Sequence, residues 1–375
     1  MKDRKVDFLA KLKFITTQEG GRKSPAKSGY RPQLKFGFSE NQTSGEQTYI
    51  GRELVHPGET VYAEIRMLSP LFFSYALLKG MGFEFREGAR VIGTGEIIAI
   101  INEELNKKLI IKNKLEKVFP IIFEITDEIP IDWEQVYDTF NNKFEYYKSI
   151  WERKNNLPFR IQASFYNIIT EAVKGDASAI RLLDCIRFLF GALNKSLDKT
   201  EKKLLKNSVF GFLTNMDSKY LNFLGELLFV NYIRITKPGS KLVATEEPTD
   251  SGDKEGPKID FRFINYSNEK HLRVEILNLH LNEEKEWNEE EIERLLAQKI
   301  TEKLNSKRIV NRADIILVPI LWGKWDHVQK IARYYEERGI EFGNTFTPFS
   351  YIPFADQSGN SEHIFGTIDS IFRRS

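Results

Sequence analysis

The chain has 375 residues, enough for two or three domains, and 41% of them are hydrophobic, which supplies ordinary cores. The formal net charge is only +2, so no overall basic field indicates a nucleic-acid partner, and any such binding must depend on local patches. The single cysteine, Cys185, excludes an intramolecular disulfide, and the lack of a signal-peptide pattern or a membrane-spanning apolar stretch predicts a cytoplasmic protein that enters no membrane.

Residues 5–104 show the period-2 alternation of half-buried β-strands. In the segments 6–14 and 61–67 an apolar side chain occupies every second position, and Phe83 and Phe85 alternate with charged neighbours. Glycine and proline separate these segments at positions that suit tight corners. The pattern predicts a small antiparallel β-barrel.

Two blocks in this region carry a specific motif. Residues 19–33 read Glu-Gly-Gly-Arg-Lys-Ser-Pro-Ala-Lys-Ser-Gly-Tyr-Arg-Pro-Gln, and residues 83–95 read Phe-Glu-Phe-Arg-Glu-Gly-Ala-Arg-Val-Ile-Gly-Thr-Gly. In order and spacing, with the pair Pro57-Gly58 between them, they resemble the third, C-terminal β-barrel domain of elongation factor Tu. No GTPase precedes the barrel in this sequence. Residues 20–24 lack the second glycine of a phosphate-binding loop, because Arg22 occupies its place, so we expect no GTP binding.

The resemblance implies a contact with RNA. In the elongation factor this domain touches the T stem of aminoacyl-tRNA, and the matching positions here are Gln33, Glu87 and Gly88. The basic residues Arg22 and Arg31 of the same block complete the candidate nucleic-acid contacts. Residues 23–25 read Lys-Ser-Pro where the family has His-Thr-Pro, which removes a histidine from this loop. An ordinary interpretation also stands, since Gln33 and Glu87 are polar loop residues that any barrel would expose.

The middle of the chain is predicted to be mostly helical. Residues 109–126 alternate enough apolar side chains to predict one or two further strands, and from about 132 to 233 the period changes to that of amphipathic helices. Asp176 is a plausible N-cap. Cys185 lies in the apolar run 180–190, which favours a buried structural thiol over a nucleophile.

The last 160 residues predict an α/β domain. A helix that carries Glu226 is followed by strands near 241–246, 258–264 and 272–279, a charged helix over 287–306, a strand at 315–321 and a helix from Asp326 to about Arg338. This order resembles the core of the PD-(D/E)XK nuclease superfamily. Residues 342–375 are rich in aromatics, glycine and polar turns, and we assign no element there. The expected architecture is multi-domain α+β, with a barrel at 1–105, a connector and helical region at 106–215 and a nuclease-like domain at 216–375.

The nuclease resemblance implies a metal site. The superfamily's helix glutamate, strand aspartate and strand glutamate correspond to Glu226, Asp260 and Glu275, and such carboxylates bind Mg²⁺, which polarises a phosphodiester and activates water. Leu277 occupies the place of the usual lysine. The alternative is therefore a degenerate nuclease fold that is retained for binding.

Three side chains could replace the missing lysine. Lys299 and Lys303 lie on the following helix, where some superfamily members carry the basic residue, and His280 just beyond the strand is a candidate acid or base. Each also has an ordinary interpretation, since lysines suit a solvated helix face and a histidine suits a strand end.

Two hypotheses follow. The chain is a Mg²⁺-dependent nuclease that the barrel directs to tRNA or other structured RNA, or it is a binding protein with an inactive nuclease fold that docks on a translation component or on a partner of the elongation factor. The direction of Lys299 and Lys303 discriminates between them: a lysine that points at the carboxylates favours the enzyme, and two solvent-facing lysines favour the binding protein.

Overall fold

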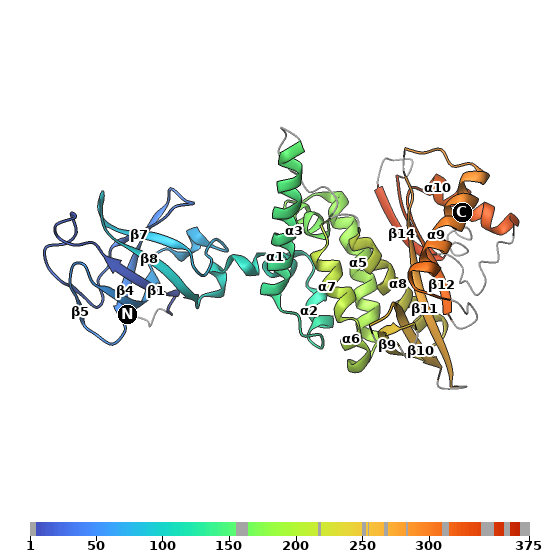
Figure 1. Ribbon diagram of the computed structural model, residues 1–375, viewed down its shortest axis with the longest axis horizontal. Coiled ribbons are helices and arrows are strands. Elements are labelled where there is room, and N and C mark those ends of the chain that lie inside the picture. The colour runs from blue at the N-terminus through green and yellow to red at the C-terminus, as the bar shows by residue number, and fades with distance from the viewer. Residues whose placement is uncertain are drawn as a thin grey trace. The chain divides into compact units, whose positions relative to one another are not determined.

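The computed structural model describes residues 5–154, 164–216, 219–249, 253, 255–265, 269–282, 284–309, 315–338, 349–355 and 361–367. The chain divides into two compact units, Met1–Asn113 and Lys114–Ser375 (Figure 1). The predicted helical region and the predicted α/β domain therefore lie in the same compact unit, and a further division at residue 215 stays a prediction. No helix in the described part of the chain has the length and apolar character needed to cross a bilayer.

The first unit is the predicted barrel. Six strands close on themselves in the order β1-β6-β4-β3-β7-β8, and every neighbouring pair is antiparallel. They are β1 (Phe8–Phe14), β3 (Gln33–Phe36), β4 (Gln42–Tyr49), β6 (Thr60–Met67), β7 (Gly82–Glu87) and β8 (Arg90–Ile100). The ribbon of β2 (Ala26–Lys27) and β5 (Leu54–Val55) and the 3-10 turns η1 (Pro70–Phe73), η2 (Glu103–Leu105) and η3 (Lys107–Leu109) complete the unit.

The alternation of apolar and polar side chains along the strands explains how the barrel interior is filled. The apolar positions of β1 and β6 point inward, where Phe8, Phe14 and Phe85 are fully buried. Two glycines of β8 make room for these large rings: a Cβ on Gly93 would lie 1.9 Å from the Phe85 ring, and a Cβ on Gly95 would lie 2.2 Å from the Phe83 ring. Closure leaves no exposed strand edge, which is how a small sheet avoids association through its edges.

The middle region consists of helices throughout. They are α1 (Ile110–Val118), α2 (Ile121–Thr126), α3 (Trp133–Lys154), α4 (Phe165–Val173), α5 (Ala177–Ser196), α6 (Lys199–Leu204), α7 (Lys206–Thr214) and α8 (Tyr220–Thr236). The prediction of strands within 109–126 is wrong, because the buried positions there recur three or four residues apart, which is the helical period: Ile111, Leu115, Phe119, Ile122 and Ile125.

Two smaller predictions for this region have different outcomes. The Asp176 side chain accepts a hydrogen bond from Ala179 N (2.8 Å) and caps α5, as predicted. Cys185 is half-buried rather than buried.

A six-stranded sheet forms the rest of the second unit, in the order β14-β13-β12-β11-β10-β9. The strands are β9 (Ser240–Pro248), β10 (Lys258–Asn265), β11 (Lys270–His280), β12 (Ile315–Trp322), β13 (Phe349–Ala355) and β14 (Ser361–Thr367). The pairs β11–β12 and β12–β13 are parallel and the others are antiparallel. The predicted order from α8 to α10 is confirmed, whereas β13 and β14 were not predicted.

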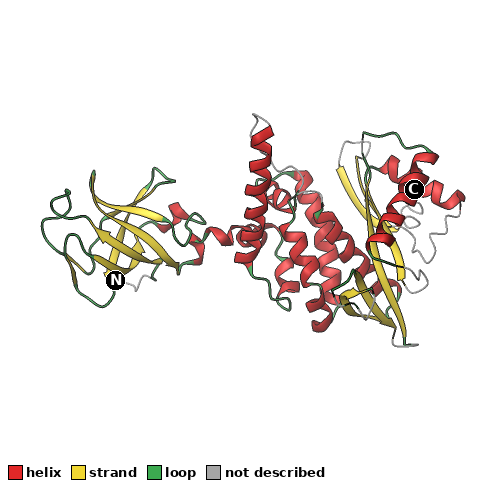
Figure 2. Ribbon diagram, in the orientation of Figure 1, coloured by secondary structure: helices red, strands yellow, loops and turns green. Residues whose placement is uncertain are grey.

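Helices cover both faces of this sheet (Figure 2). The parallel crossovers contain α9 (Glu289–Ser306) and α10 (Trp325–Arg338), which cover one face over a core that includes Leu277, Leu279 and Leu321. On the other face α8 lies close against β11 and β12, since a Cβ on Gly225 would lie 2.8 Å from both the Asn278 and the Ile320 side chains. Successive residues of β11 therefore face α9 and α8 in turn.

Candidate functional site

The two strand carboxylates lie where β10 and β11 separate. The backbone pairing of these strands ends at Phe261 and Val274. Beyond that pair, Asp260 N donates to Glu275 Oε2 (3.2 Å), and Ile276 N donates to Asp260 Oδ2 (2.7 Å). Carboxylate oxygens thus replace the backbone carbonyls as acceptors, and the opening between the strands holds Asp260 and Glu275 side by side.

Two lysines at the C-terminal end of α9, Lys303 within the helix and Lys307 as its C-cap, point at this pair of carboxylates. Lys303 Nζ lies 2.7 Å and Lys307 Nζ 2.8 Å from Glu275 Oε1, and Lys307 Nζ is also 3.9 Å from Asp260 Oδ1. Lys307 follows Lys303 by four residues with helical backbone at the cap, so both side chains extend to the same side. The Glu275 side chain is 0% exposed, and a buried carboxylate is tolerated only when cations or hydrogen bonds offset its charge.

The third carboxylate comes from α8. Ser208 Oγ of α7 donates to Glu226 Oε2 (2.6 Å). Burial, together with the negative charge of Asp260, raises the pKa of Glu226 to about 8. Burial and the charge of Glu275 likewise raise the pKa of Asp260 to about 6. Each carboxylate therefore lies within electrostatic range of the next, and the cluster carries more negative charge than its surroundings favour.

Lys303 is the cation that responds to all three carboxylates. Burial alone would lower its pKa, but the charges of Glu275, Asp260 and Glu226 raise it above the ordinary value of lysine. Lys303 is thus held in its charged form at the centre of the carboxylate cluster. We name Glu226, Asp260, Glu275, Lys303 and Lys307 the carboxylate–lysine cluster.

The predicted metal ligands Glu226, Asp260 and Glu275 stay a prediction. Among the residues that the structure describes, no group of three or more His, Cys, Asp or Glu side chains is placed to hold a metal ion. The Glu226 carboxylate is bound to Ser208 on the α8 side of the sheet, and both ammonium groups contact Glu275 Oε1. Asp260 and Glu275 remain as an adjacent pair of oxygen donors.

The other predicted catalytic residues lie apart from the cluster. Lys299 Nζ pairs with Glu302 Oε2 (2.8 Å) on the exposed surface of α9. His280 Nε2 is 2.7 Å from Asn222 Oδ1, and its ring stacks on Trp322. His280 lies five positions beyond Glu275 along β11, so it belongs to the opposite face of the sheet. Leu277, in the usual lysine position, is buried in the core beneath α9.

Two members of this neighbourhood were missed by sequence reasoning. Lys307 follows Lys303 by four residues, and that spacing could have identified it as a second cation on the same helix face. Ser208 had no comparable signal, because a serine eighteen residues before Glu226 becomes its neighbour only through the packing of α7 on α8.

The barrel places its candidate RNA contacts at one end. Gln33 is exposed and pairs in register with Arg86, the residue before Glu87. Gly88, with a φ of +62°, forms the exposed turn that follows. Arg31 is 57% exposed and pairs with Glu46.

Glu87 and Arg22 instead hold two loops together. Glu87 forms ion pairs with Arg22 and Arg90 and accepts a hydrogen bond from the Tyr30 hydroxyl (2.7 Å). The Arg22 guanidinium also lies 4.6 Å above the Tyr30 ring. Burial alone would raise the pKa of Glu87, but the hydrogen bonds from Tyr30 and Arg90 and the charge of Arg22 lower it below the ordinary value. These contacts tie the 19–33 loop to the β7–β8 turn.

Comparison with known families agrees with the barrel geometry. Residues 3–101 match the family model described as the elongation factor Tu C-terminal domain. The match spans about a quarter of the chain and coincides with the six-stranded barrel. It confirms the resemblance of the N-terminal region, while the resemblance of the C-terminal region to nucleases stays a prediction.

Proposed function

We propose that the chain is a metal-dependent nuclease that cleaves RNA, with the barrel as the module that directs it to tRNA or to another part of the translation apparatus. The observation that carries this proposal is the contact between Lys303 and Glu275. A lysine on α9 points at the strand carboxylates, which is the arrangement that sequence reasoning associated with the enzyme rather than the binding protein.

Hydrolysis of a phosphodiester needs charge stabilisation that the cluster can provide. Negative charge develops on the phosphoryl oxygens in the transition state, and a fixed ammonium group nearby stabilises it. Lys303 is charged and held by three carboxylates, so it needs little reorganisation to act. Lys307, the residue that caps the C-terminal end of α9, is a second donor.

A Mg²⁺ ion fits the pair Asp260 and Glu275. Magnesium is commonly bound through one or two carboxylates together with substrate phosphates, so the absence of a third protein ligand does not conflict with it. Burial first, and the neighbouring carboxylate second, raise the pKa values of Glu226 and Asp260, so a bound cation would favour their charged forms. When bound, the ion would polarise the phosphodiester and lower the pKa of a water molecule.

The barrel supports the choice of RNA. It matches a domain of a translation factor, and its exposed residues Arg31 and Gln33 lie near the end where that family contacts tRNA. The proposal places the protein in the cytoplasm, where translation occurs, and assigns it no GTP.

A second candidate is a binding protein without catalytic activity. The observation that favours it is that both ammonium groups already contact Glu275 Oε1, so the described part of the cluster resembles a closed network of ion pairs. In that case the barrel docks on a translation component and the cluster only stabilises the fold.

One assay distinguishes the two candidates. Purified protein is incubated with total RNA, tRNA and plasmid DNA in Mg²⁺, in Mn²⁺ and in EDTA. Cleavage that requires the metal and disappears in Asp260→Asn and Glu275→Gln, but not in Lys299→Ala, supports the nuclease. Intact substrates under all conditions, with RNA binding retained, would support the binding protein.

A further inference from the structure

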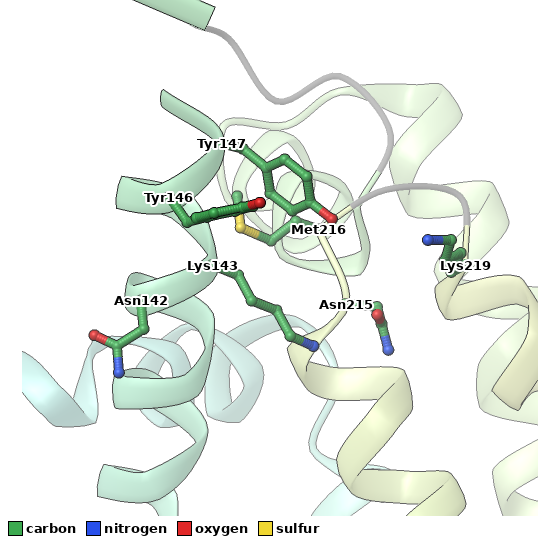
Figure 3. A pocket seen from close by; sticks show the side chains of 7 residues that line it. All are labelled: Asn142, Lys143, Tyr146, Tyr147, Asn215, Met216 and Lys219. Carbon is green, nitrogen blue, oxygen red and sulfur yellow. The ribbon is translucent and has the colours of Figure 1, made fainter. Parts of the chain in front are cut away.

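A second site lies at the N-terminal end of α8. A pocket of about 410 Å³ lies between α3 and three residues near the end of α7 and the start of α8, Asn215, Met216 and Lys219 (Figure 3). It is lined by Asn142, Lys143, Tyr146, Tyr147, Asn215, Met216 and Lys219. Ligand pockets commonly measure about 300–1,000 Å³, so the volume suits a group the size of a nucleotide.

The pocket combines exposed aromatic rings with positive charge. Tyr146 is 61% and Tyr147 40% exposed, and their ring centroids are 5.4 Å apart at 70°. A flat base that stacks on one ring would meet the other edge to face, which is an arrangement that aromatic groups favour. The ammonium ends of Lys143 and Lys219 point from opposite sides toward the space between the two elements (Figure 3). No lining residue is acidic.

The same character continues along α3. Lys143, Tyr147, Trp151 and Lys154 recur three or four residues apart, so they lie on one face of the helix, which extends about 16 Å at 1.5 Å per residue. Glu145 and Glu152 fall on the opposite face by the same spacing. A stripe of aromatic and basic side chains with amides beside it is the composition that binds single-stranded nucleic acid through base stacking and phosphate contacts.

We propose that this aromatic pocket and the α3 stripe bind a single-stranded segment of nucleic acid. The tyrosine rings stack on bases, Lys143 and Lys219 contact phosphates, and the amides of Asn142 and Asn215 contact base edges. An acidic peptide could satisfy the lysines, but it would leave the faces of two exposed tyrosines without a flat partner.

The helix α8 relates this pocket to the carboxylate–lysine cluster. Lys219 and Glu226 are seven residues apart, about 10 Å along the helix, and Asn222 lies between them on the same face. A strand held in the pocket would thus extend toward the cluster. The inference rests on the proposed function only for this last step, in which the bound strand is the nuclease substrate.

Binding is measured by fluorescence anisotropy with the full chain in EDTA, which separates binding from cleavage. The probes are labelled ten-nucleotide oligouridine and oligothymidine. The Tyr146→Ala/Tyr147→Ala variant should bind at least tenfold more weakly, since each stacked base contributes substantially to affinity. Tyr146→Phe/Tyr147→Phe keeps the rings and should bind like the wild type. The Lys143→Ala/Lys219→Ala variant should reduce the slope of log affinity against log salt by about 1.4, since each phosphate contact with a single strand contributes about 0.7.

Phe188→Ala is the matched control, because Phe188 is 78% exposed on α5 and does not line the pocket. The inference would be overturned if Tyr146→Ala/Tyr147→Ala bound the probes as tightly as the wild type, or if Phe188→Ala lost as much affinity as that variant. It would also be overturned if polyglutamate displaced the probes as well as unlabelled oligonucleotide does, or if neither probe bound. A preference for either probe identifies the favoured strand and supports it. If binding depends on the tyrosines but Mg²⁺ produces no cleavage, the binding inference is supported and the nuclease proposal fails. If RNA is cleaved but binding does not depend on the tyrosines, the nuclease proposal is supported and the binding inference fails.

Discussion

Lys303 and Glu275 form the central ion pair of the C-terminal sheet, with 2.7 Å between Nζ and Oε1. Glu275 and Leu277 lie on the same face of β11, and Leu277, where the predicted nuclease resemblance would require a lysine, packs under α9. The helix that covers this leucine supplies the ammonium group instead. The charge is retained near the carboxylates although the side chain comes from a different element.

Removal of the Lys303 ammonium group tests its role in catalysis. In Mg²⁺ and with tRNA or total RNA as substrate, Lys303→Ala should lower the cleavage rate by about 10²- to 10³-fold, the effect of deleting one fixed donor from a transition state. Lys299→Ala is the control, because Lys299 pairs with Glu302 on the same helix and should leave the rate within about twofold. Equal rates for the two variants would assign Lys303 to stability alone.

Glu226 should make stability depend on pH in metal-free buffer. Burial and the charge of Asp260 raise its pKa from 4.5 to about 8 in the folded protein. Between these values the unfolded chain loses the proton while the folded chain keeps it, so this contribution to stability is present below about pH 4.5 and is lost as the pH rises to about 8.

The Glu226→Gln variant should lack that dependence. Its unfolding temperature should exceed that of the wild type at pH 8.5 and approach it at pH 4.5, as measured by circular dichroism in EDTA. Glu302→Gln is the control, since Glu302 lies on the exposed surface of α9 and hydrogen bonds from Lys299 lower its pKa. Parallel curves for wild type and Glu226→Gln would show that Glu226 does not titrate in this range.

The spacing of apolar residues and the loop motifs predicted those elements whose formation depends on residues close together in the sequence. Alternation predicted the barrel strands, and two loop motifs predicted the family that residues 3–101 match. Helical and strand periods also predicted the order from α8 to α10. The prediction of strands at 109–126 was wrong because a short apolar segment fits the period of a strand and that of a helix equally well. Only the packing of α1 and α2 selects the helical period.

The site was less predictable than the fold. Asp260 and Glu275 were predicted from the resemblance of the strand order to a nuclease superfamily, but their hydrogen bonds to each other's backbone depend on where the β10–β11 pairing ends. The direction of Lys303, and not Lys299, toward the sheet depends on the rotation of α9, which its buried stripe fixes. On α3, Val136 and Phe140 are buried, whereas Tyr147, which recurs at the same helical spacing, is 40% exposed. Periodicity shows that side chains share a face but not whether another element covers it.

Glu87 should stabilise the barrel rather than serve only as an RNA contact. Glu87→Gln removes the charge that pairs with Arg22 and Arg90, and because Glu87 is only partly buried we expect a loss of about 1–2 kcal/mol in the free energy of unfolding. Urea unfolding of residues 1–113, a compact unit, measures it. Glu84→Gln, which removes a pair with Arg86 on the surface of β7, should cost less than half as much. If the urea midpoint of Glu87→Gln equalled that of the wild type, Glu87 would not stabilise the barrel and would remain a candidate RNA contact.

The two units should cooperate in binding structured RNA. A barrel that contacts RNA through a few polar groups binds weakly alone, but tethering it to a second nucleic-acid surface raises the effective concentration and can increase affinity by roughly a hundredfold. The full chain should therefore bind tRNA more tightly than residues 1–113 or 114–375, and phosphate contacts should make that affinity fall between low and physiological salt. Filter binding at several salt concentrations, in EDTA, measures both effects.

A variant within the full chain separates the barrel's contribution from the effect of truncation. Arg31→Ala/Gln33→Ala removes two exposed side chains of the barrel and should weaken tRNA binding toward that of residues 114–375, while Lys79→Ala serves as the control on the same unit. If the full chain, the variant and residues 114–375 bind alike, the barrel does not deliver the protein to RNA. Its role would then be to dock on a protein, and the surface to test next would be the one that partners of the elongation factor recognise.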